Sequence, residues 1–331
     1  MKNLLITGGA GYIGSVLSEQ LIANNFKVTC IDKLDFGSES IDLLKKNDNF
    51  ELHKIDINNF DKFEKILKNK KYDAVMHLAS IVGDPACGLN PELAEKTNWH
   101  ASKWLIDKCI ELKIERFIFA STCSNYGKML DSNSYVNEDS ILAPVSLYAE
   151  LKVKVEKYIL ENISRSINFC PTILRFSTVY GISKRMRFDL TINEFVKELY
   201  TNKKLLVFGE QFWRPYCHVI DFAQAYISVL DAPKELVSYN VYNVGDTSEN
   251  YTKQMIVDKI KEKINGCSIS YVKKVEDPRD YRVNSDKIKK ELGFTISMTL
   301  EDGIEEIICG LKKNSFGKTD NQKYYNIPFK I

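Results

Sequence analysis

A phenol and an ammonium group are spaced in this sequence as proton transfer would require. Tyr148 and Lys152 lie four residues apart in a predicted helix over 145–163, so both side chains are on one helix face. A free phenol, with a pKa near ~10, is a poor base at neutral pH, but a nearby ammonium ion favours the phenolate. A Tyr-x-x-x-Lys pair alone also occurs by chance on surface helices. This pair follows a polar run over 121–127 at the end of a predicted strand, which indicates acid–base chemistry on a hydroxyl group.

Three glycines near the start of the chain have the spacing of a phosphate-binding loop. A predicted strand over 4–7 leads into Gly8, Gly11 and Gly14, and a predicted helix over 12–24 follows. This spacing allows a tight turn, a close approach of a pyrophosphate to the backbone, and close packing of helix on strand. The unpaired N–H groups at the helix N-terminus then face the phosphates. The residues that we expect to bind a dinucleotide here are Gly8, Gly11, Tyr12, Ile13 and Gly14.

Two acidic residues at later strand ends indicate which dinucleotide this is. Asp32 follows the predicted strand over 27–31 and lies 18 residues after Gly14. A carboxylate at this place accepts hydrogen bonds from the adenosine ribose and repels a 2′-phosphate, so the predicted cofactor is NAD rather than NADP. The alternative role of Asp32 is to cap a loop. Asp56 follows the next predicted strand and is placed to contact the adenine, although aspartates are also common in turns.

The elements that position these motifs alternate between short apolar runs and amphipathic helical patterns. Such alternation predicts βαβ units and an α/β fold with a doubly wound parallel (Rossmann) sheet. Its strands are continuous apolar runs because helices cover both faces of such a sheet. The predicted strands are 4–7, 27–31, 50–54, 74–78, 116–120 and 169–175, and the predicted helices are 12–24, 61–70, 91–112 and 145–163.

After residue 180 the pattern changes to a smaller mixed α/β region, which we expect to form the substrate domain. Its predicted elements are helices over 191–200, 222–230 and 252–264 and short strands over 205–208 and 268–272. We therefore divide the chain into a dinucleotide-binding domain over 1–180, to which 215–245 returns, and a second domain over 181–214 and 246–331. The tail over 317–331 has no clear period.

Composition and charge exclude several classes of protein. The 331 residues include 46 basic and 44 acidic side chains, and a formal net charge of +2 gives no reason to expect nucleic acid or an anionic membrane as a partner. Four histidines, and eight cysteines without a Cys-x-x-Cys pair, indicate that no metal is bound. No stretch approaches the ~20 apolar residues of a membrane helix, so we expect a cytoplasmic protein. Six of the eight arginines lie in the second half, which indicates either a phosphorylated ligand there or scattered surface charge.

The motifs occur in one order along the chain, and together they identify a family. Those of the first half are Thr7-Gly8-x-x-Gly11-x-x-Gly14, Asp32, His77-Leu78-Ala79-Ser80, Ser121-Thr122 with Tyr126-Gly127, and Tyr148-x-x-x-Lys152. Those of the second half are Leu174-Arg175-Phe176 with Val179-Tyr180-Gly181, Trp213-Arg214-Pro215-Tyr216-Cys217-His218-Val219-Ile220-Asp221, and Leu292-Gly293. Over residues 1 to about 310, the chain resembles the extended short-chain dehydrogenases/reductases of the nucleotide-sugar epimerase/dehydratase family.

The resemblance implies roles for the matching residues. Tyr148 would exchange a proton with a sugar hydroxyl, Lys152 would hold the nicotinamide ribose and tune Tyr148, and Thr122 would hydrogen-bond the same sugar oxygen. The cofactor-binding residues that it implies, beside those of the glycine loop, are Asp32, Asp56, Ile57, Leu78, Ala79 and Lys152. The substrate-binding residues that it implies are Thr122, Ser124, Thr178, Asn193, Arg214 and Arg279, with Asn193 and Arg214 at a substrate diphosphate. Relatives pair through two helices, so a homodimer through 91–112 and 146–163 is expected.

Departures from the family pattern reduce the number of reactions that the resemblance allows. Sugar 4,6-dehydratases of the family carry an acidic pair directly after the catalytic threonine, whereas this chain has Cys123 and Ser124, which argues against elimination of water. Thr178 stands where many relatives have an asparagine that contacts the substrate. In the loop over 81–87, Asp84 is equally suited to a sugar contact and to a turn. Cys123 has no histidine near it in the sequence, so a thiol nucleophile is not favoured.

The resemblance therefore implies a nucleotide-diphosphate sugar as substrate and hydride abstraction at the sugar C4. Tyr148 would remove the hydroxyl proton while NAD takes the hydride, and return of the hydride to the other face would make the protein a 4-epimerase, an enzyme of polysaccharide biosynthesis. The same groups would serve a nucleotide-sugar C4 dehydrogenase or a 4-ketosugar reductase, and both alternatives stay open. A non-catalytic NAD sensor is a third alternative, against which the intact Thr122, Tyr148 and Lys152 argue. We expect His218 to be structural.

Overall fold

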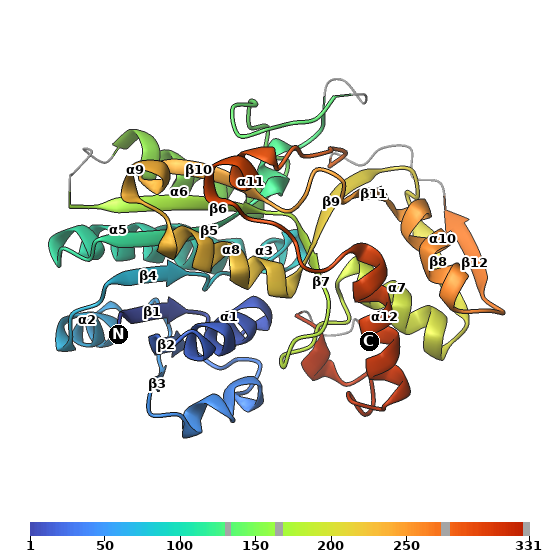
Figure 1. Ribbon diagram of the computed structural model, residues 1–331, viewed down its shortest axis with the longest axis horizontal. Coiled ribbons are helices and arrows are strands. Elements are labelled where there is room, and N and C mark those ends of the chain that lie inside the picture. Colours follow the sequence, from blue (N-terminus) through green and yellow to red (C-terminus); the bar gives the residue numbers. More distant parts are fainter. Residues whose placement is uncertain (130–133, 163–167, 273–278, 327–331) are drawn as a thin grey trace.

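The central sheet of the molecule has seven strands and is parallel throughout. The computed structural model describes residues 1–129, 134–162, 168–272 and 279–326. The strands are β1 Asn3–Thr7, β2 Lys27–Asp32, β3 Phe50–Lys54, β4 Ala74–His77, β5 Arg116–Thr122, β6 Cys170–Phe176 and β10 Asn240–Val244. They lie in the order β10-β6-β5-β4-β1-β2-β3, and every neighbouring pair is parallel (Figure 1). The α/β fold with a doubly wound parallel sheet that the sequence predicted is therefore confirmed.

The strand order places a switch point between β1 and β4. From β1 the chain runs outward through β2 and β3, and it then returns to β4 and continues in the opposite direction through β5 and β6. Thr7 at the end of β1 is in register with both Ile31 and His77, so the carboxyl ends of the three strands meet at one edge. Doubly wound sheets bind ligands at this edge, beside the switch point.

Helices cover both faces of this sheet (Figure 1). On one face, α1 (Tyr12–Ala23) packs against α8 (Val219–Asp231) over the apolar side chains of the strands. On the other face, α2 (Phe60–Asn69), α5 (Ala101–Glu111) and α6 (Leu147–Lys157) bury a second apolar cluster. Because both sets of strand side chains are buried, the strands consist of continuous apolar runs rather than alternating ones.

The smaller part of the molecule contains two short sheets and a separate core. Its elements are β7 Thr178–Tyr180, α7 Thr191–Thr201, β8 Lys204–Phe208, β9 Trp213–His218, β11 Asn250–Thr252, α10 Lys253–Lys263, β12 Ser268–Val272 and α12 Leu300–Lys312. One sheet has the order β11-β9-β7, and β8 pairs with β12 in parallel. The helices α7, α10 and α12 bury an apolar cluster between them. The remaining helices are α3 Asp84–Leu89, α4 Pro91–Glu95, α9 Lys234–Val237 and α11 Asp286–Leu292.

Some elements differ from those predicted. The single helix expected over 91–112 is divided into α4, a π-helical turn over Lys96–His100, and α5. Asn98 lies in that turn, and its side chain accepts from the N–H of Ile81 at 2.8 Å and donates to the Ile81 carbonyl at 2.9 Å. The strand β10 was not predicted, since asparagines interrupt its apolar run.

The division of the chain into domains stays a prediction, and the end of the tail, over 327–331, lies outside the described residues. Within the part of the chain that the structure describes, no helix is long and apolar enough to cross a membrane.

A buried ion pair joins β6 to α6. Arg175 Nη2 lies 2.7 Å from Glu156 Oε2, and the two side chains are 5% and 1% exposed. Asn125 Nδ2 donates to Glu156 Oε1 at 2.8 Å, and the hydroxyl of Ser121 in β5 donates to the same oxygen. The carboxylate of one helix therefore binds groups from two neighbouring strands and the turn after β5.

Replacing Arg175 with leucine should lower the free energy of unfolding by about 3–5 kcal/mol, because the Glu156 carboxylate would remain buried without its partner. Urea unfolding followed by circular dichroism measures this change. The matched control is Lys234→Met, whose ion pair with Glu115 is exposed and is worth less than ~1 kcal/mol. An Arg175→Leu loss as small as that of the control would contradict a structural role for the buried pair.

Candidate active site

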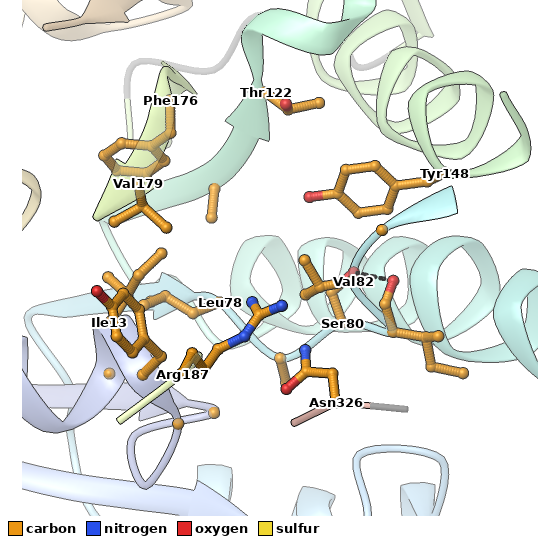
Figure 2. Close-up of a pocket in the computed structure, with 18 of the residues that line it drawn as sticks. Ile13, Leu78, Ser80, Val82, Thr122, Tyr148, Phe176, Val179, Arg187 and Asn326 are labelled. Atoms are coloured by element: carbon orange, nitrogen blue, oxygen red, sulfur yellow. Dashed lines mark hydrogen bonds between the residues drawn. The ribbon is translucent and has the colours of Figure 1, made fainter. Parts of the chain in front are cut away.

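A large cavity lies at the carboxyl end of the seven-stranded sheet, between the sheet and the smaller part of the molecule. Its volume is about 660 Å³, in the range of sites that enclose small molecules. The glycine loop after β1, the ends of β2 to β6, and residues of α6, α7 and β9 line it. Figure 2 shows Thr122 and Tyr148 on one side of this cavity and Arg187 and Asn326 on the other.

The loop between β1 and α1 leaves its backbone open to a phosphate. Gly8 has φ +77°, in the left-handed region, and a Cβ atom on Gly14 would lie 2.0 Å from the Gly8 carbonyl oxygen. Among the residues that the structure describes, no side chain caps α1, and its first turn holds no acidic residue. Its first N–H groups can therefore bind an anion. These features fit the pyrophosphate of NAD, which binds where side chains are absent and a helix begins.

The predicted residues Tyr12 and Ile13 both line the cavity at the start of α1. The Tyr12 hydroxyl, however, donates to the Gly181 carbonyl at 2.5 Å, and the residue is only 6% exposed. Tyr12 can therefore offer its backbone N–H to a cofactor, while its ring ties α1 to the smaller part of the molecule.

Asp32 lies at the end of β2 with its carboxylate oriented by the backbone. Its Oδ2 accepts from the N–H of Ala10 at 3.0 Å, and its Oδ1 accepts from the N–H of Leu34 at 2.8 Å. Burial raises the pKa of this carboxyl group. Asp56 Oδ1 accepts from the N–H of Asn58 at 2.8 Å, and both aspartates line the cavity. The other predicted cofactor residues in the lining are Ile57, Leu78 and Ala79, and the contacts of this group with NAD stay a prediction.

The three predicted catalytic residues come together at one end of the cavity. Thr122 ends β5, and Tyr148 lies in the first turn of α6 with its hydroxyl directed into the cavity (Figure 2). The Thr122 Oγ1 accepts from the N–H of Ser124 at 3.1 Å, which orients it. Lys152 Nζ donates to the Ala120 carbonyl at 2.7 Å and lies 5.8 Å from the centre of the Tyr148 ring. This arrangement suits the exchange of a proton with a substrate hydroxyl.

Burial controls the titration of both groups of the Tyr-x-x-x-Lys pair. It raises the pKa of the Tyr148 phenol, and the nearby Cys87 and Asp84 raise it further, while Arg187 lowers it. Burial also lowers the pKa of Lys152 to about 8. In the protein alone, burial therefore outweighs the lowering of the Tyr148 pKa that we expected from Lys152.

Four of the predicted substrate residues beyond Thr122 line the cavity, namely Ser124, Thr178, Arg214 and Arg279. Arg214 Cζ lies 5.4 Å from the centre of the Tyr281 ring. Arg279 Nη1 lies 2.9 Å from Asp84 Oδ2, so Asp84 binds an arginine from a distant part of the chain. The contacts of these residues with a substrate stay a prediction.

The prediction that Asn193 binds the substrate diphosphate is wrong in this geometry. Asn193 is fully buried, and it is not part of the cavity lining. Its Oδ1 accepts from the N–H of Gly181 at 2.9 Å, and its Nδ2 donates to the Arg187 carbonyl at 2.8 Å and to the Tyr12 hydroxyl at 3.1 Å. The hydrogen-bonding groups of this amide are thus occupied within the protein, where they hold the loop over 181–187 in place.

His218 and Cys123 both lie outside the cavity lining. His218 Nε2 lies 2.9 Å from Glu306 Oε2, and its Nδ1 accepts from the N–H of Ile220 at 3.3 Å, as expected for a structural histidine. The Cys123 thiol is 1% exposed and donates to the Arg175 carbonyl at 3.2 Å. Burial raises the pKa of this thiol, which disfavours a nucleophilic thiolate.

Sequence reasoning missed several polar residues of the cavity lining, among them Arg185, Arg187 and Asn326. Arg187 binds Asp189 through Nε and Nη2, both at 2.9 Å, and the Asn326 N–H donates to the same carboxylate at 3.0 Å. The concentration of arginines in the second half was a signal for the two arginines. Asn326 lies in the tail without a period, where the sequence holds no signal.

Lys152→Met should change the pH dependence of stability. The pKa of Lys152 is about 8 in the folded protein and 10.5 in an unperturbed chain, so between these values the unfolded chain binds more protons and the free energy of unfolding rises with pH. This contribution of Lys152 should be on the order of 3 kcal/mol in the wild type and absent in Lys152→Met, so the difference in unfolding free energy between the two proteins should change by this amount across the range. Buried thiols such as Cys123, whose contribution has the opposite sign, are common to both proteins. Urea unfolding across this pH range measures this difference, with the exposed Lys154→Met on the same helix as control. A difference in unfolding free energy between wild type and Lys152→Met that stays constant across this range would contradict the assignment.

Three comparisons place the chain among known proteins. A sequence model described as the NAD dependent epimerase/dehydratase family matches residues 4–245. The putative UDP-glucose 4-epimerase of Methanocaldococcus jannaschii is 28% identical over 318 residues, which are 94% of this chain and 99% of the relative. The dTDP-D-glucose 4,6-dehydratase of Dictyostelium discoideum is 29% identical over 263 residues, 75% of this chain and 59% of the relative.

Among solved structures, the UDP-glucose 4-epimerase of Thermotoga maritima with UDP-glucose has a TM-score of 0.83 at 26% identity, covering 95% of this chain and 99% of that one. The resemblance predicted from the motifs is thus confirmed over most of the chain, and with it the NAD cofactor. With the glycine loop, the carboxylate after β2 and the tyrosine–lysine pair all facing one cavity, the chain belongs to the NAD dependent epimerase/dehydratase family of enzymes.

Proposed function

We propose that this protein is a nucleotide-sugar 4-epimerase, which takes a hydride from C4 of the sugar and returns it to the opposite face. The observation that carries the proposal is the pair of hydroxyl groups of Thr122 and Tyr148 at one end of the cavity, with no carboxylate at the two positions after Thr122. Proton exchange at a single sugar hydroxyl needs these groups and no further acid or base.

Each residue of this end of the cavity has a separate task in the proposed reaction. Tyr148 takes the proton of the C4 hydroxyl and gives it back after the sugar has turned, so that no proton is gained or lost over a cycle. Lys152 lies one helical turn after Tyr148, and its ammonium group is held by the Ala120 carbonyl. Its charge stabilises the phenolate. Thr122 hydrogen-bonds the same sugar oxygen. NAD, when bound, supplies the acceptor for the hydride.

The residues after Thr122 argue against elimination of water. Elimination needs an acid for the leaving hydroxyl and a base for the neighbouring carbon. The Cys123 thiol is turned into the core, and the Ser124 hydroxyl lies 3.4 Å from that of Tyr281. Neither the thiol nor the hydroxyl takes the place of the carboxyl group that would serve as this acid or base at neutral pH. Asp84, which the sequence placed in a loop but which begins α3, is paired with Arg279.

Positive side chains support a nucleotide diphosphate as the other part of the substrate. Arg214, Arg279 and Lys253 line the cavity, and an arginine fork pairs with two phosphate oxygens at once. The similarity to a 4-epimerase solved with UDP-glucose supports the same class of substrate.

We also propose that two copies of the chain pair through α4, α5 and α6, the described helices of the predicted segments over 91–112 and 146–163. The exposed apolar residues Leu89, Leu93 and Val145 lie next to these helices, and pairing would remove them from water. Light scattering should therefore give twice the chain mass of 38.0 kDa. A monomer at micromolar concentration would contradict this pairing.

Tyr148→Phe should lower kcat by about 10²–10⁴-fold, because the ring keeps its packing but has lost the oxygen that exchanges the proton. The wild type, given NAD and UDP-, GDP- or CDP-sugars in turn, should convert one of them into its 4-epimer without net formation of reduced nicotinamide. Chromatography of the sugars and absorbance of the reduced cofactor measure both quantities. Tyr158→Phe is the control, since Tyr158 lies beyond α6, binds Asp107 and does not line the cavity.

The other outcomes distinguish the remaining reactions. Steady accumulation of reduced nicotinamide would identify a C4 dehydrogenase, and turnover of a 4-ketosugar alone would identify a reductase. Full activity of Tyr148→Phe would exclude the phenol as the acid–base group. Binding of NAD without any turnover would favour a sensor.

A further inference from the structure

Arg185 is a buried arginine, and within the part of the chain that the structure describes two of its guanidinium nitrogens have no hydrogen-bonding partner. It is 6% exposed and lines the cavity, and neither Nε nor Nη2 has a hydrogen-bond partner among the described residues. Burial lowers its pKa to about 10, so it still carries its charge at neutral pH. Because an unpaired buried charge destabilises a protein, one that faces a binding cavity indicates an anionic ligand.

Two contacts fix where this guanidinium lies. Arg185 Cζ stacks 4.0 Å from the centre of the Phe36 ring, in the cavity-lining loop after β2. Ser183, two residues before Arg185, donates to the Tyr12 carbonyl at 2.7 Å, and its hydroxyl lies 3.0 Å from that of Ser15. The chain that carries Arg185 therefore lies across the first turn of α1, whose N–H groups face the cavity.

The segment 181–187 is held at both ends by groups other than Arg185. Gly181 donates its N–H to Asn193 Oδ1 and accepts the Tyr12 hydroxyl proton at its carbonyl. At the other end, the Arg187 carbonyl accepts from Asn193 Nδ2. The path of the segment is thus set by its backbone, and the charge of Arg185 is not needed to maintain it.

We propose that Arg185 binds the pyrophosphate of NAD from the side opposite the glycine loop. Its place over the first turn of α1 puts the guanidinium beside the helix N-terminus where a pyrophosphate binds, and its fork can bind two phosphate oxygens. Arg185 could instead bind a 2′-phosphate on the adenosine ribose of NADP. The Asp32 carboxylate at the end of β2 disfavours that phosphate. The assignment concerns how the cofactor is held, and it stands whichever sugar reaction the protein catalyses.

Arg185→Met should weaken NAD binding and, without NAD, stabilise the protein. We expect the Kd for NAD to rise about tenfold to a hundredfold, because the variant loses a charged group that hydrogen-bonds the ligand. The melting temperature of the nucleotide-free protein should rise, because the unpaired buried charge is gone. Titration calorimetry and scanning calorimetry on the full chain, stripped of bound nucleotide, measure the two changes. If Arg185 had only a structural role, Arg185→Met would have a lower melting temperature and an unchanged Kd for NAD.

Lys184→Met is the matched control, because it removes the same charge from the neighbouring residue, which is exposed and outside the cavity lining. It should leave both quantities unchanged. If the Kd of Arg185→Met for NAD lies within about twofold of the wild-type value, the proposal is overturned. If the variant loses affinity for NADP alone, Arg185 binds the 2′-phosphate instead. If Arg185→Met does not fold, Arg185→Lys keeps the charge without the fork and should bind NAD with intermediate affinity; wild-type affinity in that variant would also overturn it.

Discussion

The ion pair between Arg175 and Glu156 determines where the acid–base residues lie. Glu156 is one turn beyond Lys152 on α6, and its carboxylate binds Ser121, the residue before Thr122 on β5. A rotation of the helix about its axis would separate these buried groups, at a high cost in free energy. The phenol and the ammonium group of α6 therefore keep one orientation toward the end of β5.

Electrostatics divide the cavity into regions with different tasks. At one end, burial favours the neutral forms of both Tyr148 and Lys152, so the proton rests on the phenol in the protein alone. A positive charge brought near this phenol favours the phenolate, as Arg187 already does from across the cavity. The cationic side chains elsewhere in the lining, such as Arg185 and Arg214, are those that we propose to bind phosphates. Acid–base chemistry and phosphate binding are thus served by separate groups.

The sequence predicted those parts of the fold and site that depend on local patterns. Apolar runs such as those that contain β1 and β5 identified the central strands, and the glycine spacing identified the turn where Gly14 must lack a side chain. Residues whose role depends on distant contacts were beyond such reasoning. Asn193 stands on a helix near the arginines, yet its amide is bound by Tyr12 and by two backbone groups. Arg185 and Asn326 reach the cavity only through tertiary packing, which no local period encodes.

The contact between the Tyr12 hydroxyl and Asn193 of α7 has a consequence for the order in which the protein is made. The Tyr12 hydroxyl meets the Asn193 amide, which is 181 positions later in the chain. A growing polypeptide can form β1, α1 and the glycine loop early, but this partner emerges from the ribosome only after more than half of the chain has been synthesised. Contacts of such long separation form late in folding. The first helix must therefore remain incompletely anchored during synthesis, and fragments that end before β7 would lack the anchor altogether.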